Sequence, residues 1–88
     1  MTIHKGDTIR LKASFYTFAG DLANPESVVC KVYNSNRNIM ATLSTTYSST
    51  GIYYADYTTA IEGMFTYEFT GTLEGSSILS RDGFVVGW

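Results

Sequence analysis

The sequence predicts an all-β chain folded as an antiparallel sandwich of six to seven strands. Short runs in which every second residue is apolar recur along the chain, separated by turn residues at the spacing of about 8–12 residues that sandwiches show. The 88 residues also include seven Tyr and five Phe, and aromatic residues favour strands. A chain of this length has room for one hydrophobic core, so we expect residues 1–88 to form a single domain.

The clearest runs are 51–57 and 62–69, each with a glycine at or near its start and polar turn residues before it. Alternation with a period of two is typical of a strand that has one face on the core and one in solvent. We therefore expect two strands that lie close enough to pair as neighbours. In the first run we place Tyr53 inward, because this choice leaves Asp56 in solvent. The residues expected to point inward are Tyr53, Ala55, Tyr57, Phe65, Tyr67 and Phe69.

Four further strands are predicted, at 8–16, 28–33, 39–43 and 78–88. In the first of them the alternation of apolar and polar residues is close to ideal for a half-buried strand. The residues expected to point inward from these strands are Ile9, Leu11, Ala13, Phe15, Val28, Cys30, Val32, Phe84, Val86 and Trp88.

The connections are predicted from Gly, Asn, Pro and Ser, which favour turns. Residues 17–27 form a loop in which Leu22 is expected to fill the end of the core. Residues 34–38 form a polar turn and 74–77 a hairpin loop. The polar run 81–83 interrupts the last strand and predicts a bulge there.

The net charge of −2 and the pI near 5.1 argue against binding to nucleic acid, which needs clustered positive charge. The six Lys and Arg residues are scattered. Cys30 is the only cysteine, so no intramolecular disulfide can form. Its apolar neighbours in the predicted strand indicate a small buried residue rather than a nucleophile.

No constellation of residues predicts catalysis. Asp7, Asp21, Asp56 and Asp82 fall on separate turns or edges, where isolated acids are usually solvated or form turns. One histidine and one cysteine cannot supply the four ligands of a structural zinc site. We therefore expect a protein that is not an enzyme and that uses no cofactor or metal. No apolar run approaches the length of about 20 residues that spans a bilayer, so we expect no membrane partner.

Tyrosine supplies the only positive signal for a binding surface. Tyr16, Tyr33 and Tyr54 are predicted to face outward, and Tyr47 to lie in the connecting stretch 44–50. Tyrosine is enriched at protein interfaces, which makes these four the candidate partner-binding residues. Tyrosines also occupy exposed sheet faces because they have high β-propensity and pack well across strands. Composition leaves both interpretations open.

The run 61–67 resembles the immunoglobulin-like pattern in which an acid, a glycine and an aromatic residue open the sixth strand of the fold. Phe65 stands where a corner tyrosine often lies, and Tyr67 where the disulfide cysteine would lie. The chain departs from antibody domains at both positions and has no tryptophan in its middle strands. It is more similar to bacterial or viral immunoglobulin-like domains.

The segments 6–15, 20–22, 25–28, 50–57 and 62–67 together are similar to small immunoglobulin-like proteins encoded among the structural genes of tailed bacteriophages and prophages. The resemblance implies a virion protein, made in the host cytoplasm, that decorates the head or serves as a tail accessory. Its partners would be capsid or tail proteins, with a homo-oligomer as a further expectation. The alternative is an adhesion module of a phage tail or bacterial surface protein that binds a cell surface or its glycans.

Overall fold

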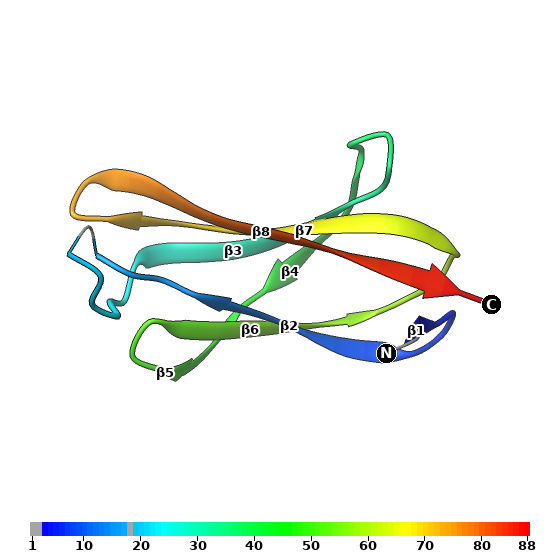
Figure 1. Cartoon of the computed structure of the whole chain (residues 1–88), viewed down its shortest axis with the longest axis horizontal. Helices are drawn as coiled ribbons and strands as arrows, with labels where there is room; N and C mark the ends of the chain where they lie inside the picture. Colours follow the sequence, from blue (N-terminus) through cyan, green and yellow to red (C-terminus); the bar gives the residue numbers. More distant parts are fainter. Residues whose placement is uncertain (1–2, 18) are drawn as a thin grey trace.

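Two sheets face each other in the computed structural model, which describes residues 3–17 and 19–88 (Figure 1). Neighbouring strands in these residues pair antiparallel, as predicted, except that the first strand pairs in parallel with the last. No helix occurs in the described residues, so the all-β prediction is confirmed. The larger sheet has the strand order β1-β8-β7-β3-β4, and the smaller has the order β2-β6-β5. The strands of the described residues are β1 (Ile3–His4), β2 (Thr8–Ser14), β3 (Glu26–Tyr33), β4 (Ile39–Ser44), β5 (Thr46–Ser49), β6 (Ile52–Thr58), β7 (Gly63–Leu73) and β8 (Ser76–Gly87).

The hairpin of β7 and β8 is the longest paired element, with a continuous register from Gly63 opposite Val86 to Leu73 opposite Ser76. The bulge predicted at 81–83 is therefore wrong. Arg81, the first residue of that run, donates to Glu68, which lies opposite it in the register. The predicted hairpin loop at 74–77 is too long. The turn needs only Glu74 and Gly75, both with positive φ (52° and 80°), as a two-residue type I′ turn requires.

The two runs that first indicated strands do not pair with each other. β6 lies in the three-stranded sheet beside β2 and β5, whereas β7 lies in the five-stranded sheet between β8 and β3. The connection at 59–62 passes from one sheet to the other, so the inward faces of β6 and β7 meet across the core. Thr59 holds this crossing, because its buried hydroxyl donates to the His4 carbonyl at 3.1 Å and accepts from the Gly6 N–H at 2.9 Å.

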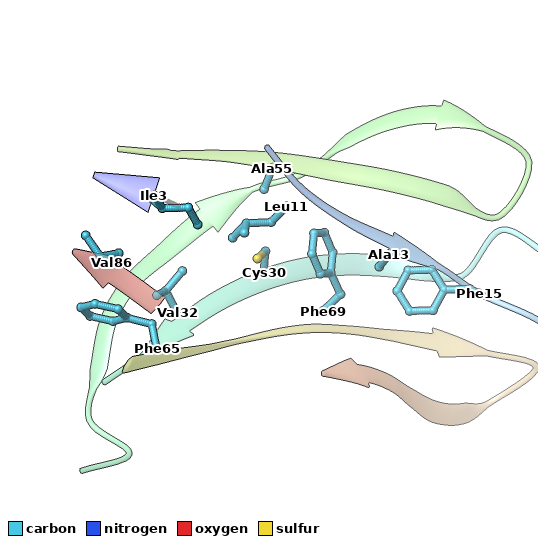
Figure 2. Close-up of a cluster of buried hydrophobic side chains, with 10 residues drawn as sticks. All are labelled: Ile3, Leu11, Ala13, Phe15, Cys30, Val32, Ala55, Phe65, Phe69 and Val86. Atoms are coloured by element: carbon cyan, nitrogen blue, oxygen red, sulfur yellow. The ribbon is translucent and has the colours of Figure 1, made fainter. Parts of the chain in front are cut away.

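The core lies between the sheets and draws side chains from both (Figure 2). The predicted inward faces of β2, β3, β6 and β7 are confirmed, with Cys30, Val32 and Phe69 fully buried. Phe84 and Val86 of β8 also contribute. The buried hydrophobic residues are Ile3, Leu11, Ala13, Phe15, Cys30, Val32, Ala55, Phe65, Phe69 and Val86.

Two residues expected in the core lie outside it. Leu22 is 42% exposed, and it forms an isolated bridge with Tyr16. Phe15 instead occupies the core at this end, at 3% exposure. Trp88 is 90% exposed, because β8 ends at Gly87 and the last residue extends beyond the sheet.

Candidate interaction surface

The four tyrosines proposed from the sequence do not converge on one site. Tyr33 ends β3 on the outer face of the five-stranded sheet, and Tyr54 lies on the outer face of the three-stranded sheet. Tyr47 belongs to β5, where the sequence predicted a loop, and it is 54% exposed. Tyr16 is 56% exposed at its bridge to Leu22. Only Tyr33 therefore lies on a surface that also presents exposed apolar side chains and a groove.

Tyr54 is engaged by its own chain. The guanidinium carbon of Arg10 lies 3.9 Å from the centroid of the Tyr54 ring, within the range of a cation–π contact. The same guanidinium donates from Nε to Asp56 Oδ1 at 2.8 Å and from Nη2 to Asp56 Oδ2 at 3.1 Å. This hydrogen bonding lowers the pKa of the Asp56 carboxyl below its ordinary value. The arrangement fits cross-strand packing on an exposed sheet, the second of the two interpretations left open for the tyrosines.

The outer face of the five-stranded sheet carries large apolar side chains in cross-strand positions. Met64 lies opposite Val85 in the register of β7 and β8, and the two are 67% and 60% exposed. Leu79, on the same face, is 51% exposed opposite Thr70, and Ile39 is 56% exposed opposite Tyr33. We call this surface the outer face; by register and alternation it comprises Val29, Lys31, Tyr33, Ile39, Thr42, Met64, Thr66, Glu68, Thr70, Leu79, Arg81 and Val85.

Sequence reasoning missed the apolar members of this face, although a signal for them was present. Met64, Leu79 and Val85 occupy the outward positions of strands whose alternate residues are core residues. An apolar residue at such a position has no role in the core. Single apolar residues on a surface are ordinary, whereas Met64 and Val85 form an exposed cross-strand pair and Leu79 lies farther along β8, beyond Arg81. Recognising the pair requires the register of β7 against β8, which the sequence does not supply.

A groove of about 570 Å³ opens on the outer face. In its lining Arg81 donates from Nη2 and Nε to Glu68 Oε2, at 2.7 and 3.0 Å. The turn after β3 forms one wall, in which Asn34 Oδ1 accepts from the N–H groups of Asn36 and Asn38. The groove is lined by Tyr33, Asn34, Arg37, Thr66, Glu68 and Arg81. With two guanidinium groups and one carboxylate it has a local excess of positive charge, on a chain whose net charge is −2.

Two kinds of feature, clusters of metal-ligating side chains and membrane-spanning helices, are absent from the described parts of the chain. Across residues 3–17 and 19–88, no three His, Cys, Asp or Glu side chains lie where they could hold a metal ion together. Within the same ranges, no helix is long and apolar enough to cross a membrane. What the arrangement offers is a surface with apolar, aromatic and cationic groups, which suits binding.

Burial should make Cys30 unreactive in the folded protein. Its side chain is fully buried, and burial raises the pKa of the thiol to about 11. Because the thiolate is the reactive form, we expect alkylation at pH 8 to occur only through unfolding, at least about a hundredfold more slowly than in urea. Mass spectrometry of iodoacetamide-treated protein measures this rate. Fast labelling under native conditions would contradict the burial of Cys30.

The raised pKa of Cys30 also predicts how stability depends on pH. The folded state disfavours the thiolate. Below the thiol pKa of the unfolded chain the thiol is protonated in both states, so this group does not lower the free energy of unfolding there. Between that value and about 11 it falls as the unfolded chain loses its proton first. Cys30→Ala removes this titration. The variant should therefore lose less stability than the wild type as the pH rises above the thiol pKa of the unfolded chain.

No family model matches this chain, and neither the curated proteins nor the solved structures contain a match to it.

Proposed function

We propose that the sandwich is immunoglobulin-like. In the variable form of that fold one sheet contains the strands G, F, C and C′, and the other contains B, E and D. Assigning β2 to β8 the letters B, C, C′, D, E, F and G in chain order turns the observed sheets into G-F-C-C′ and B-E-D. The short strand β1, parallel to β8, then extends the first sheet. The strand order supports this assignment, as does the position of Phe65 and Tyr67 in β7.

We propose that the protein is a non-enzymatic structural component of a tailed-phage virion, bound to the head as a decoration or accessory protein. The observation that carries the protein-binding part of this proposal is the outer face, with Met64, Leu79 and Val85 each more than half exposed on one sheet. The virion part rests on the resemblance of the sequence to phage immunoglobulin-like proteins.

Binding through the outer face would require no chemical step. Burial of the Met64–Val85 pair supplies apolar contact, at roughly 25 cal/mol per Å² removed from water. Lys31 and Arg81 lie in one cross-strand row with Glu68, between the Met64–Val85 pair and Leu79, and would orient the partner through charge. A particle that presents many equivalent sites would bind many copies, each held by the same contact.

The test is co-sedimentation with purified phage heads, using tails and host cells as separate comparisons. Wild-type protein should sediment with the heads and saturate. A Met64→Asp/Val85→Asp variant should bind about tenfold or more weakly, because it places two charges in the contact. The matched control is Thr8→Asp/Ser14→Asp, which adds the same charges to exposed positions of the three-stranded sheet and should bind normally. Absence of wild-type sedimentation, or normal binding by the outer-face variant, would overturn the proposal.

The groove favours a second candidate function, adhesion to glycans of a cell surface. Tyr33 supplies a ring against which a sugar can stack, and Asn34, Thr66 and Arg81 supply groups that can hydrogen bond to hydroxyls. This reading predicts saturable binding to a glycan array, lost in Tyr33→Ala, together with no binding to heads. Binding to heads without binding to glycans would reject it.

A further inference from the structure

Charge is distributed unevenly along this chain. All six Lys and Arg and all eight Asp and Glu residues lie outside the segment 38–55. That segment contains the whole of β4 and β5 and the first part of β6. A surface strand without charge is unusual, because natural proteins place charged residues or proline on the free edges of sheets to prevent pairing with another chain.

The other free edges of the described residues carry such protection. β2, at one edge of the three-stranded sheet, has Arg10 and Lys12 in its middle. β8 is paired with β1 only at Val86 and Gly87, and its remaining length includes Arg81 and Asp82. By contrast, the edge strands β4 and β5 hold neither charge nor proline.

The two unprotected edges adjoin. Only Thr45 separates the end of β4 from the start of β5, and its hydroxyl donates to the Val28 carbonyl at 3.0 Å. Figure 1 shows β4 running from the larger sheet down to β5 at the edge of the smaller one. The pairing of β4 with β3 shifts near Tyr33 and is regular from Ala41 to Ser44. One side of the sandwich therefore presents a regular, uncharged edge.

We propose that two copies of this protein pair antiparallel along β4, about a two-fold axis, so that their five-stranded sheets become continuous. A two-fold contact sets residues of a strand opposite residues of the same strand. On β2 such pairing would bring Arg10 and Lys12 against their own copies, which costs free energy through like-charge contact. On β4 every pairing is between uncharged side chains, which is why the edge suits a second copy.

Backbone hydrogen bonds would supply the contact, as in other edge-to-edge associations. Tyr47, exposed beside this edge on β5, lies at the rim of the contact. The pairing would also place two outer faces side by side. The inference concerns self-association alone, so it stands or falls independently of binding to a virion.

Sedimentation velocity over a wide range of concentrations tests the proposal. Wild-type protein should pass from monomer to dimer. Thr42→Lys, at an exposed position in the middle of β4, should weaken dimerisation by about tenfold or more, because a charge in the middle of a strand paired about a two-fold axis is brought close to its own copy. Ser14→Lys, at the exposed end of β2, is the matched control and should dimerise like the wild type. Circular dichroism and thermal unfolding verify that both variants fold.

A charge-reversal mixture separates loss of the contact from loss of structure. Thr42→Lys and Thr42→Glu should each remain monomeric alone and should form a heterodimer when mixed, because the opposed charges then attract. Three results would overturn the proposal: a monomeric wild type at every concentration, unchanged dimerisation of Thr42→Lys, or no recovery in the mixture. The first would leave β4 available to a strand of another protein.

Discussion

We expect Phe69→Ala to lower the free energy of unfolding by about 3–5 kcal/mol, since removing a buried phenylalanine loses its transfer free energy and leaves a cavity. Phe69 is the largest of the fully buried side chains. It lies opposite Cys30 in the register of β7 and β3 and makes an edge-on contact with Tyr67, with the ring centroids 6.0 Å apart. A domain of this size has roughly 5–15 kcal/mol of stability in total, so this substitution alone removes a large part of it.

Urea unfolding, monitored by circular dichroism, measures the change in the free energy of unfolding. Leu79→Ala is the control on the opposite side of the same sheet, where the side chain is 51% exposed, and it should change stability by no more than about 1 kcal/mol. If Phe69→Ala is unfolded in water, Phe69→Leu provides a milder variant with an expected loss of about 1–2 kcal/mol. Equal losses for Phe69→Ala and Leu79→Ala would contradict the position of Phe69 in the core.

The sequence predicted well which face of each strand points into the core, because a strand with one buried side repeats its apolar residues with a period of two. The choice of Tyr53 over Asp56 as inward was correct for a physical reason. Asp56 faces solvent, paired with Arg10. Periodicity does not say which strand lies beside which, however. β6 and β7 are consecutive and both half-buried, and the same pattern fits two strands of one sheet as well as two strands facing each other across the core.

Two strands were not predicted, and neither carries a sequence signal. All four residues of β5 are exposed, so the strand has no apolar alternation to reveal it. β1 has two residues and is defined by parallel pairing of Ile3 with Val86, at the other end of the chain. Such pairing is a long-range property of the folded chain. The same reason limits prediction of the outer face, since Met64 and Val85 become neighbours only through the register of β7 and β8.

Gly51→Ala should be the most costly of the small substitutions, with an expected loss of about 2–4 kcal/mol. Two costs add at this position. The φ angle of +74° is one that residues with a side chain rarely adopt, which costs about 1 kcal/mol for a residue other than glycine. A Cβ would also lie 2.8 Å from the Phe15 carbonyl oxygen and 2.9 Å from Leu22 Cδ2, and relieving such contacts in a packed region costs a further 1–3 kcal/mol or so.

The crowding arises because Gly51 ties the loop after β2 to the start of β6. Its N–H donates to Asn24 Oδ1 at 2.8 Å, and its carbonyl accepts from the Phe15 N–H at 2.8 Å. An added methyl group would push this loop away and weaken both hydrogen bonds. Leu22, which does not fill the core, packs over Gly51 instead.

Gly75→Ala is the matched control for Gly51→Ala. Gly75 has a φ of +80° in the β7–β8 turn, and a Cβ there would meet nothing within 4 Å. It should therefore cost only the backbone strain, about 1 kcal/mol. The difference between the two variants in urea unfolding measures the steric contact at Gly51 alone, because the φ angles are nearly equal. Equal losses would mean that the loop after β2 does not pack against Gly51, and the end of the core beside Phe15 would then be open.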